Sequence, residues 1–323
     1  MSALAGLTIV EDVVPTGELR RSSETVGSLE LVVTAEDEMA VKDGLADYLG
    51  DVRRDAPGLF SGLTEGGFAV QIRVAPRSET AAALLWSTGS DDHLSALSER
   101  AESAGLRLDE SGLWSGEKRL ECGDEDGLYE ALGCQWVPPE LREGENEVER
   151  AAAGTLPELV TSKDLLGVLH NHTTDSDGLA TVEEMAAAAR DRGWSFFGVA
   201  DHSPVAAYAN GVSANRLQDQ WRRIDELNAS WQDFRVVKGL EADILSDGSL
   251  DIPEGCENGL ECVVASVHSA FRLSEEVQTE RIVRAVSHPA CRVLGHPTGR
   301  LLLARPGYQV DLERVLAACA EHG

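Results

Sequence analysis

Seven histidine, aspartate and glutamate residues in the second half of the sequence could hold divalent cations together. Imidazole nitrogen and carboxylate oxygen are ligands that zinc, manganese and iron use in proteins. Two of the histidines flank a single asparagine, and the period of two in a strand would point both rings to one side. The candidate metal ligands are His170, His172, Asp177, His202, Glu241, His268 and His296. This set exceeds the four ligands of one tetrahedral ion, so we expect more than one metal.

Phosphoester hydrolysis is the chemistry that such a cluster predicts. Neighbouring divalent cations activate a water for attack on phosphorus and stabilise the attacking and leaving oxygens. Asp201 precedes one of the candidate histidines, and three roles stay open for it: to orient that histidine, to bind metal or to cap a turn.

Short apolar runs precede these residues and predict the strands that position them. Four of the runs lead into a histidine, and the third ends at Glu241; they span 165–169, 196–200, 234–240, 262–267 and 292–295. The runs recur at about the 30-residue spacing of a βα unit, and Thr181 with Glu184 predicts a capped helix between the first two. We therefore expect parallel strands whose carboxyl ends bring the metal ligands together.

The first half predicts a smaller α+β domain. Strand-like runs lie at 29–33 and 68–74, and helical patterns lie at 36–49 and 91–104. Prolines and a charged stretch between Pro138 and Pro157 mark the seam between the halves. We expect a first domain over 1–137, a linker over 138–160 and a metal-binding domain over 161–323.

The charge balance limits the partners of the protein. The chain has 28 Lys and Arg against 56 Asp and Glu, a formal net charge of −28. Such a surface repels phosphates, so any contact with nucleic acid should be local. The apolar runs are too short to span a membrane, and the first ten residues do not resemble a secretory signal. We expect a soluble cytoplasmic protein of unknown oligomeric state.

The second half resembles the PHP (polymerase and histidinol phosphatase) domain of bacterial family X DNA polymerases. The matching segments read LLGVLHNHTTDSDGLATVEEMAAAA, GVADHS, KGLEADILSDGSLDIP, VVASVHSAF and VLGHPTGRLLLARPGYQVDLE. The resemblance implies a distorted (β/α)7 barrel that holds two or three Mn²⁺ or Zn²⁺ ions and removes nucleotides from DNA 3′ ends in DNA repair. The resemblance implies that all seven candidate residues are metal ligands and that Glu241 bridges metal ions. Glu241, Asp177 and Arg300 are the expected catalytic residues, with Arg300 and Arg305 as phosphate holders.

Two further ligands of the family, from a late Asp-Ala-His motif, have no counterpart in this sequence. We therefore expect an incomplete barrel, with the chain truncated at its carboxyl end and the last strands missing.

The first half resembles the palm and thumb of the same polymerases, but the carboxylates of the polymerase site are changed. The segment TGELRRSSETVGSLELVV places Ser28 and Glu30 where the family has two aspartates, and FAVQIRVAP places Gln71 at the third. Nucleotidyl transfer needs clustered carboxylates to hold metal, so we expect the polymerase site to be inactive. We expect Arg20 and Arg21 to be exposed to solvent.

The fold class predicted is therefore α/β: an incomplete PHP-type barrel preceded by a small α+β, nucleotidyltransferase-like palm and thumb domain. The leading function is a metal-dependent 3′-5′ exonuclease. Three alternatives stay open: a DNA-directed DNA polymerase, a small-molecule phosphatase similar to histidinol phosphatases, and a noncatalytic remnant.

Overall fold

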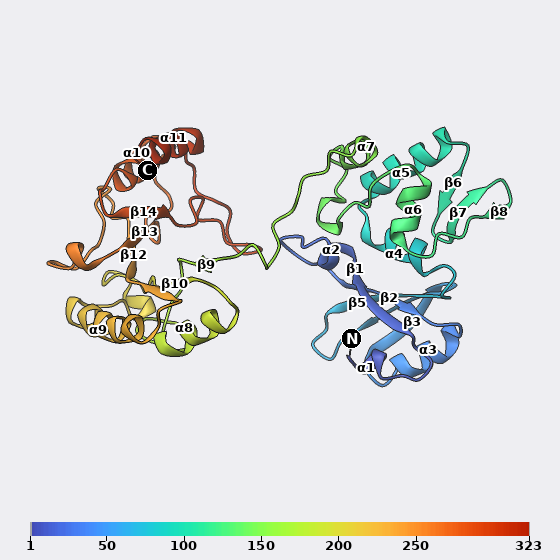
Figure 1. The fold of residues 1–323 in the computed structure, drawn as a ribbon, viewed down its shortest axis with the longest axis horizontal. Helices are drawn as coiled ribbons and strands as arrows, with labels where there is room; N and C mark the ends of the chain where they lie inside the picture. The colour runs from blue at the N-terminus through green and yellow to red at the C-terminus, as the bar shows by residue number, and fades with distance from the viewer. Residues whose placement is uncertain (1, 323) are drawn as a thin grey trace. The chain divides into compact units, whose positions relative to one another are not determined.

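A computed structural model describes residues 2–322 of the chain, which divides into two compact units, Met1–Glu158 and Leu159–Gly323 (Figure 1). Both units combine helices with strands, so the α/β class is confirmed. No helix within residues 2–322 is long and apolar enough to cross a membrane.

A five-stranded mixed sheet forms the base of the first unit. Its order is β1 (Asp12–Thr16), β2 (Leu29–Thr34), β5 (Ala69–Ala75), β4 (Leu59–Leu63) and β3 (Gly50–Ala56). Only the β2 and β5 pair runs parallel among these neighbours. Alternate residues of β5 are buried, as the strand period requires, and they pack with α3 (Glu38–Leu45) and α1 (Ser2–Ala5) in one apolar cluster.

The rest of the first unit is mostly helical. It contains α2 (Gly17–Arg20), α4 (Thr80–Thr88), α5 (Asp91–Ser103), α6 (Glu125–Ala131), η1 (Pro139–Leu141), α7 (Glu147–Ala153) and the antiparallel strands β6 (Arg107–Asp109), β7 (Gly112–Ser115) and β8 (Lys118–Arg119). The side chains of Ser90 and Asp124 accept backbone hydrogen bonds at the starts of α5 and α6. Val148 and Ala151 of α7 are buried in the same cluster as Leu97. Much of the stretch expected as a linker, 138–160, is therefore packed within this unit.

Six short strands form two parallel sheets in the second unit. One sheet has the order β11 (Arg235–Val237), β10 (Phe196–Gly198) and β9 (Gly167–Val168); the other has the order β12 (Gly239–Asp243), β13 (Cys262–Ser266) and β14 (Cys291–Leu294). A parallel bridge between His202 and Glu241 lies outside these pairings. The strands alternate with helices as expected, whereas the incomplete PHP-type barrel stays a prediction.

The prediction that the third apolar run forms one strand over 234–240 is wrong. The run divides at Lys238 between the two sheets. Gly239 explains the division, because a Cβ there would lie 2.1 Å from the carbonyl oxygen of Val199 and 2.9 Å from that of Cys262. Glycine therefore permits the backbone to pass closely between two strands.

Four helices flank these sheets: α8 (Val182–Asp191), α9 (Ala214–Ser230), α10 (Glu275–Val286) and α11 (Leu312–His322). The helices α8 and α9 pack together beside the first sheet, whereas α10 and α11 pack together beside β14 (Figure 1). Helix α8 begins with both halves of the predicted capping box, formed by Thr181 and Glu184. The helices leave the carboxyl ends of the strands to the loops that carry the candidate ligands.

Candidate metal centre

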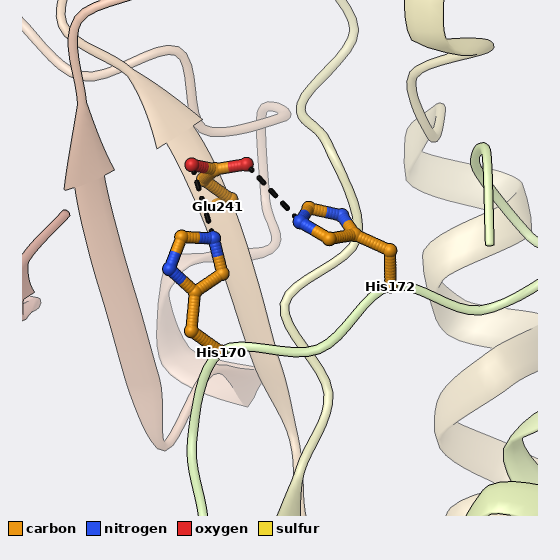
Figure 2. Close-up of side chains that lie close together, drawn as sticks. All are labelled: His170, His172 and Glu241. Carbon is orange, nitrogen blue, oxygen red and sulfur yellow. Dashed lines mark ion pairs between the residues drawn. The ribbon is translucent and has the colours of Figure 1, made fainter. Parts of the chain in front are cut away.

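Glu241 lies at the centre of the candidate ligands. Figure 2 shows its carboxylate pointing from β12 between the rings of His170 and His172, with one oxygen facing each. These rings lie at Nε2 to oxygen distances of 3.1 and 3.6 Å. The other histidines approach the same carboxylate from the ends of three further strands: His202 at 2.9 Å, His268 at 3.3 Å and His296 at 3.0 Å. The structure thus brings all five predicted histidines to Glu241.

Asp177 completes a second group of possible ligands. Its carboxylate oxygens lie 3.8 Å from His172 Nδ1 and 3.7 Å from His202 Nε2. Three sets of possible ligand atoms each lie within 4.8 Å of one another: His170, His172 and Glu241; His172, Asp177 and His202; and His202, Glu241 and His268. Adjacent sets share residues, and two of them share Glu241. This arrangement suits neighbouring cations with Glu241 between them, although the bridging role stays a prediction.

Buried polar atoms without partners test whether the site fits metal ions. His202 Nδ1 and Glu241 Oε2 lie 2.9 Å apart without forming a hydrogen bond, and both are buried without any hydrogen-bond partner. His172 Nδ1 is also buried without a hydrogen-bond partner. Unsatisfied buried polar atoms are costly, and a cation bound between His202 Nδ1 and Glu241 Oε2 would satisfy both atoms. The donor set therefore fits a metal.

The pKa shifts of Glu241 and His172 favour the charge states that bind metal ions. Burial alone would raise the pKa of Glu241, but its contacts with the surrounding histidines, His170, His202, His268 and His296, hold the pKa below its usual range. Burial and the adjacent His202 lower the pKa of His172. A charged carboxylate and neutral imidazoles are the forms that bind metal ions.

Strained backbone accompanies the site at His296, whose φ of 24° lies in the left-handed region. A residue other than glycine adopts this conformation at an energetic cost, and such residues gather at functional sites. The Nε2–H of His296 nevertheless donates to Glu241 Oε1 at 3.0 Å.

Asp243 is a site residue that the sequence reasoning missed. It is buried, its Oδ1 lies 2.5 Å from His268 Nδ1, and its backbone N–H donates to Ser203 Oγ. Burial would lower the pKa of His268, but the contacts with Asp243 and Glu241 raise it to about 9. The signal was present, because Asp243 follows Glu241 by two residues on one strand and so shares its face.

The hydrogen bonds of Asp201 indicate which of its three possible roles it serves. It accepts from the backbone N–H and hydroxyl of Thr173, from the hydroxyl of Ser176 and from the side-chain amide of Gln220. These contacts fix the loop that carries Asp177. Asp201 therefore positions its neighbouring loop rather than the ring of His202.

The two predicted phosphate holders lie in the loop after His296. The side chain of Arg300 is exposed, and its backbone N–H lies 3.4 Å from Thr298 Oγ1. Its contact with phosphate stays a prediction. Arg305 instead donates to the carbonyl oxygen of Gly299 at 2.8 Å and lies 3.9 Å from the ring centre of Phe271. Arg305 therefore stabilises the loop itself.

In the first unit, the three altered polymerase positions come together. Glu30 of β2 is the register partner of Gln71 on β5, and Ser28 Oγ lies 3.4 Å from Glu30 Oε1. Burial raises the pKa of Glu30. Of these three positions, only Glu30 thus carries a carboxylate.

The expectation that Arg20 and Arg21 are exposed to solvent is wrong. Their side chains are 19% and 13% exposed and pair with Glu125 at 2.5 Å and Glu143 at 2.8 Å. Both arginines also donate to Thr88. Their acidic partners lie more than a hundred residues away in sequence, so no local pattern could reveal them.

Comparisons with known proteins identify relatives of the chain. Residues 83–143 match the family model of the DNA polymerase beta thumb. The chain is 32% identical over 318 residues to the "DNA polymerase/3′-5′ exonuclease PolX" of Bacillus subtilis, covering 93% of this chain and 53% of that protein. A probable phosphatase of Thermoanaerobacter sp. is 30% identical over 159 residues, and one of Photobacterium profundum is 33% identical over 164 residues. These matches cover 48% and 47% of this chain, and 60% and 59% of the phosphatases. The chain thus spans only about half the length of the PolX protein.

Proposed function

Because this chain is related to bacterial PolX along 93% of its own length, we propose that its second unit is a metal-dependent phosphoesterase that removes nucleotides from DNA 3′ ends. The observation that carries the proposal is the convergence of five imidazoles and Asp177 around the buried carboxylate of Glu241. The name of the PolX relative includes a 3′-5′ exonuclease activity, which supports this choice of substrate.

The residues of the cluster divide into a buried floor and an exposed rim. The side chain of Glu241 is 1% exposed, whereas those of Asp177 and His296 are 49% and 44% exposed. A phosphodiester therefore approaches from the side of Asp177 and His296, and Glu241 would hold the cations at the buried base of the site. Arg300, in the exposed loop after His296, binds the phosphate.

Bound Mn²⁺ or Zn²⁺ supplies Lewis acidity that activates water and stabilises charge on the phosphoryl oxygens. The mixed nitrogen and oxygen ligands suit either ion. Asp243 accepts a hydrogen bond from His268 Nδ1 and so aims Nε2 at the centre. Asp201 holds the loop that presents Asp177.

The first unit is proposed to lack polymerase activity. Only Glu30 remains as a carboxylate among the three positions that resemble the polymerase site, and Gln71 beside it is a poor ligand for Mg²⁺ compared with aspartate. Arg20 and Arg21, which flank this site in sequence, are neutralised by Glu125 and Glu143.

Hydrolysis of a small phosphomonoester is the second candidate function. The probable phosphatases that match about 160 residues of the chain favour it. The two candidates differ in the charge and size of their substrate, so comparison of a DNA oligonucleotide with p-nitrophenyl phosphate separates them.

The test is Mn²⁺-dependent shortening of a 5′-labelled single-stranded oligonucleotide. His170→Ala and Glu241→Ala should each lower the rate at least about 100-fold, because each removes a group that lies at the centre of the cluster. His288→Ala is the matched control, since His288 lies outside the cluster and contacts the backbone of Ala290. Equal loss of activity in all three variants would mean that the histidines serve folding. Release of phosphate from p-nitrophenyl phosphate that is faster than shortening of the oligonucleotide would favour the second candidate.

A further inference from the structure

Tyr208 stands at the edge of the candidate metal centre. It lies in η2 (Ala207–Ala209), and its ring centre is 6.0 Å from that of His202 and 6.3 Å from that of His268. Its exposed fraction is 72%. Among the described residues of the second unit, no other aromatic side chain of phenylalanine, tyrosine or tryptophan is classed as exposed. A single exposed aromatic residue is ordinary by itself, but Tyr208 lies beside two proposed ligands.

The turn that carries Tyr208 is held firmly. Its neighbours Ala206 and Ala209 are buried, and Gly211 leaves no room for a Cβ, which would lie 2.0 Å from the carbonyl oxygen of Ser203. The side-chain amide of Asn210 donates to the carbonyl oxygen of Ser176, next to the loop position of Asp177. Tyr208 is therefore an exposed ring on a fixed support, and it needs little ordering when a ligand binds.

The charge of the chain limits how a nucleotide can gain affinity here. A net charge of −28 gives a field that repels phosphates. Stacking of a base on an aromatic ring does not depend on that charge and contributes sequence-tolerant affinity in proteins that bind single strands. The base of a nucleotide is separated from its phosphate by one sugar, so a ring beside the ligands lies within reach of the base.

We propose that Tyr208 is a binding residue that stacks on the nucleobase at the DNA 3′ end, and so selects nucleotide esters over phosphate esters that lack a base. This inference rests on the proposed phosphodiesterase function of the same site. Its substrate class is an unpaired nucleotide whose phosphate lies at the metal centre.

Two chromogenic esters test the inference. Thymidine 5′-(p-nitrophenyl phosphate) carries a base, whereas methyl p-nitrophenyl phosphate does not, and both release p-nitrophenolate. We expect Tyr208→Ala to lower the ratio of kcat/KM for the nucleoside ester to that for the methyl ester about 10-fold, mainly through KM. Tyr208→Phe should keep the ratio of the wild type, because the ring does the stacking. Tyr48→Ala, at an exposed tyrosine of the first unit, is the control and should change nothing.

A binding measurement gives a second readout. An oligonucleotide with 2-aminopurine at its 3′ end and a phosphorothioate linkage should lose fluorescence on binding to the wild type and to Tyr208→Phe, and less on binding to Tyr208→Ala. The inference would be overturned if Tyr208→Ala kept the ester ratio of the wild type and quenched 2-aminopurine as strongly as the wild type. It would also be overturned if Tyr208→Phe lowered the ester ratio as much as Tyr208→Ala. If the wild type hydrolyses neither ester, the proposed function fails, and the quenching comparison still decides whether Tyr208 stacks on a base.

Discussion

Asp243 and His268 form a hydrogen-bonded pair at the carboxyl ends of β12 and β13, with Asp243 Oδ1 2.5 Å from His268 Nδ1. The pair links the carboxyl ends of two neighbouring parallel strands. The other ring nitrogen of His268, Nε2, lies 3.3 Å from Glu241 Oε1. A carboxylate that accepts from the far nitrogen of a metal-binding histidine fixes its tautomer and orientation. Asp243 is therefore a positioning residue for the proposed centre.

The first prediction follows from this pair. Asp243→Ala should weaken metal binding about 10-fold to 100-fold, the usual effect of removing such a partner, whereas Asp243→Asn, which can still accept from Nδ1, should lose less. Competition with a chelator measures the affinity. Asp247→Ala is the control, since Asp247 bonds to Ser249 instead. An Asp243→Ala protein that binds metal as tightly as the wild type would refute the positioning role.

The second prediction concerns the stability of the first unit. Arg142 is fully buried and pairs with Glu125 at 2.6 Å, and Arg20 pairs with the same carboxylate. Glu125→Ala should lower the free energy of unfolding by about 3 to 5 kcal/mol, because it leaves a buried guanidinium without its partner. Urea denaturation measures the change. Glu143→Ala removes a more exposed ion pair of Arg21 and should cost at most about 1 kcal/mol; similar costs for the two variants would contradict the argument.

The third prediction is a dependence of that stability on pH. Burial alone would raise the pKa of Glu125, but Arg20 and Arg142 hold it below its ordinary value. A pKa lowered by folding contributes stability above the pKa of the unfolded state, about 4.3, and this contribution is lost as the pH falls through the folded value. The wild type should therefore exceed Glu125→Gln in stability at pH 7, and the difference should shrink below about pH 4. A difference that grows on acidification would have the wrong sign.

The fourth prediction concerns the altered polymerase site. Primer extension with Mg²⁺ or Mn²⁺ should give no product, because Glu30 alone cannot hold two cations for nucleotidyl transfer. Gln71→Ala should behave like the wild type. Templated synthesis that disappears in Gln71→Ala would show instead that the site is active.

The sequence was sufficient for the main strands and for the histidines that follow them. Apolar runs and βα spacing are local signals, and the ends of parallel strands meet at one edge whatever the details of packing. The division at Lys238 was not predicted, because the apolar residues of the run from Phe234 to Leu240 were taken as one strand despite Arg235 and Lys238. Gly239 was the available signal, since a glycine inside a strand often marks a close approach of another backbone.

Long-range pairing set the limit of prediction. Asp243 could have been found from its spacing to Glu241, but the four hydrogen bonds of Asp201 could not, because Gln220 and Thr173 come from distant segments. The same holds for Arg20, whose burial depends on a glutamate 105 residues later. Tertiary partners of this kind leave no periodic trace in a sequence.

The measurement that tests the central claim most directly is the metal content of the purified protein, determined by elemental analysis before and after loading with Mn²⁺ or Zn²⁺. We predict that the wild type holds more than one equivalent, that Glu241→Ala loses most of it, and that His288→Ala keeps it. A protein that binds neither ion, or a Glu241→Ala variant that binds as much as the wild type, would contradict the account.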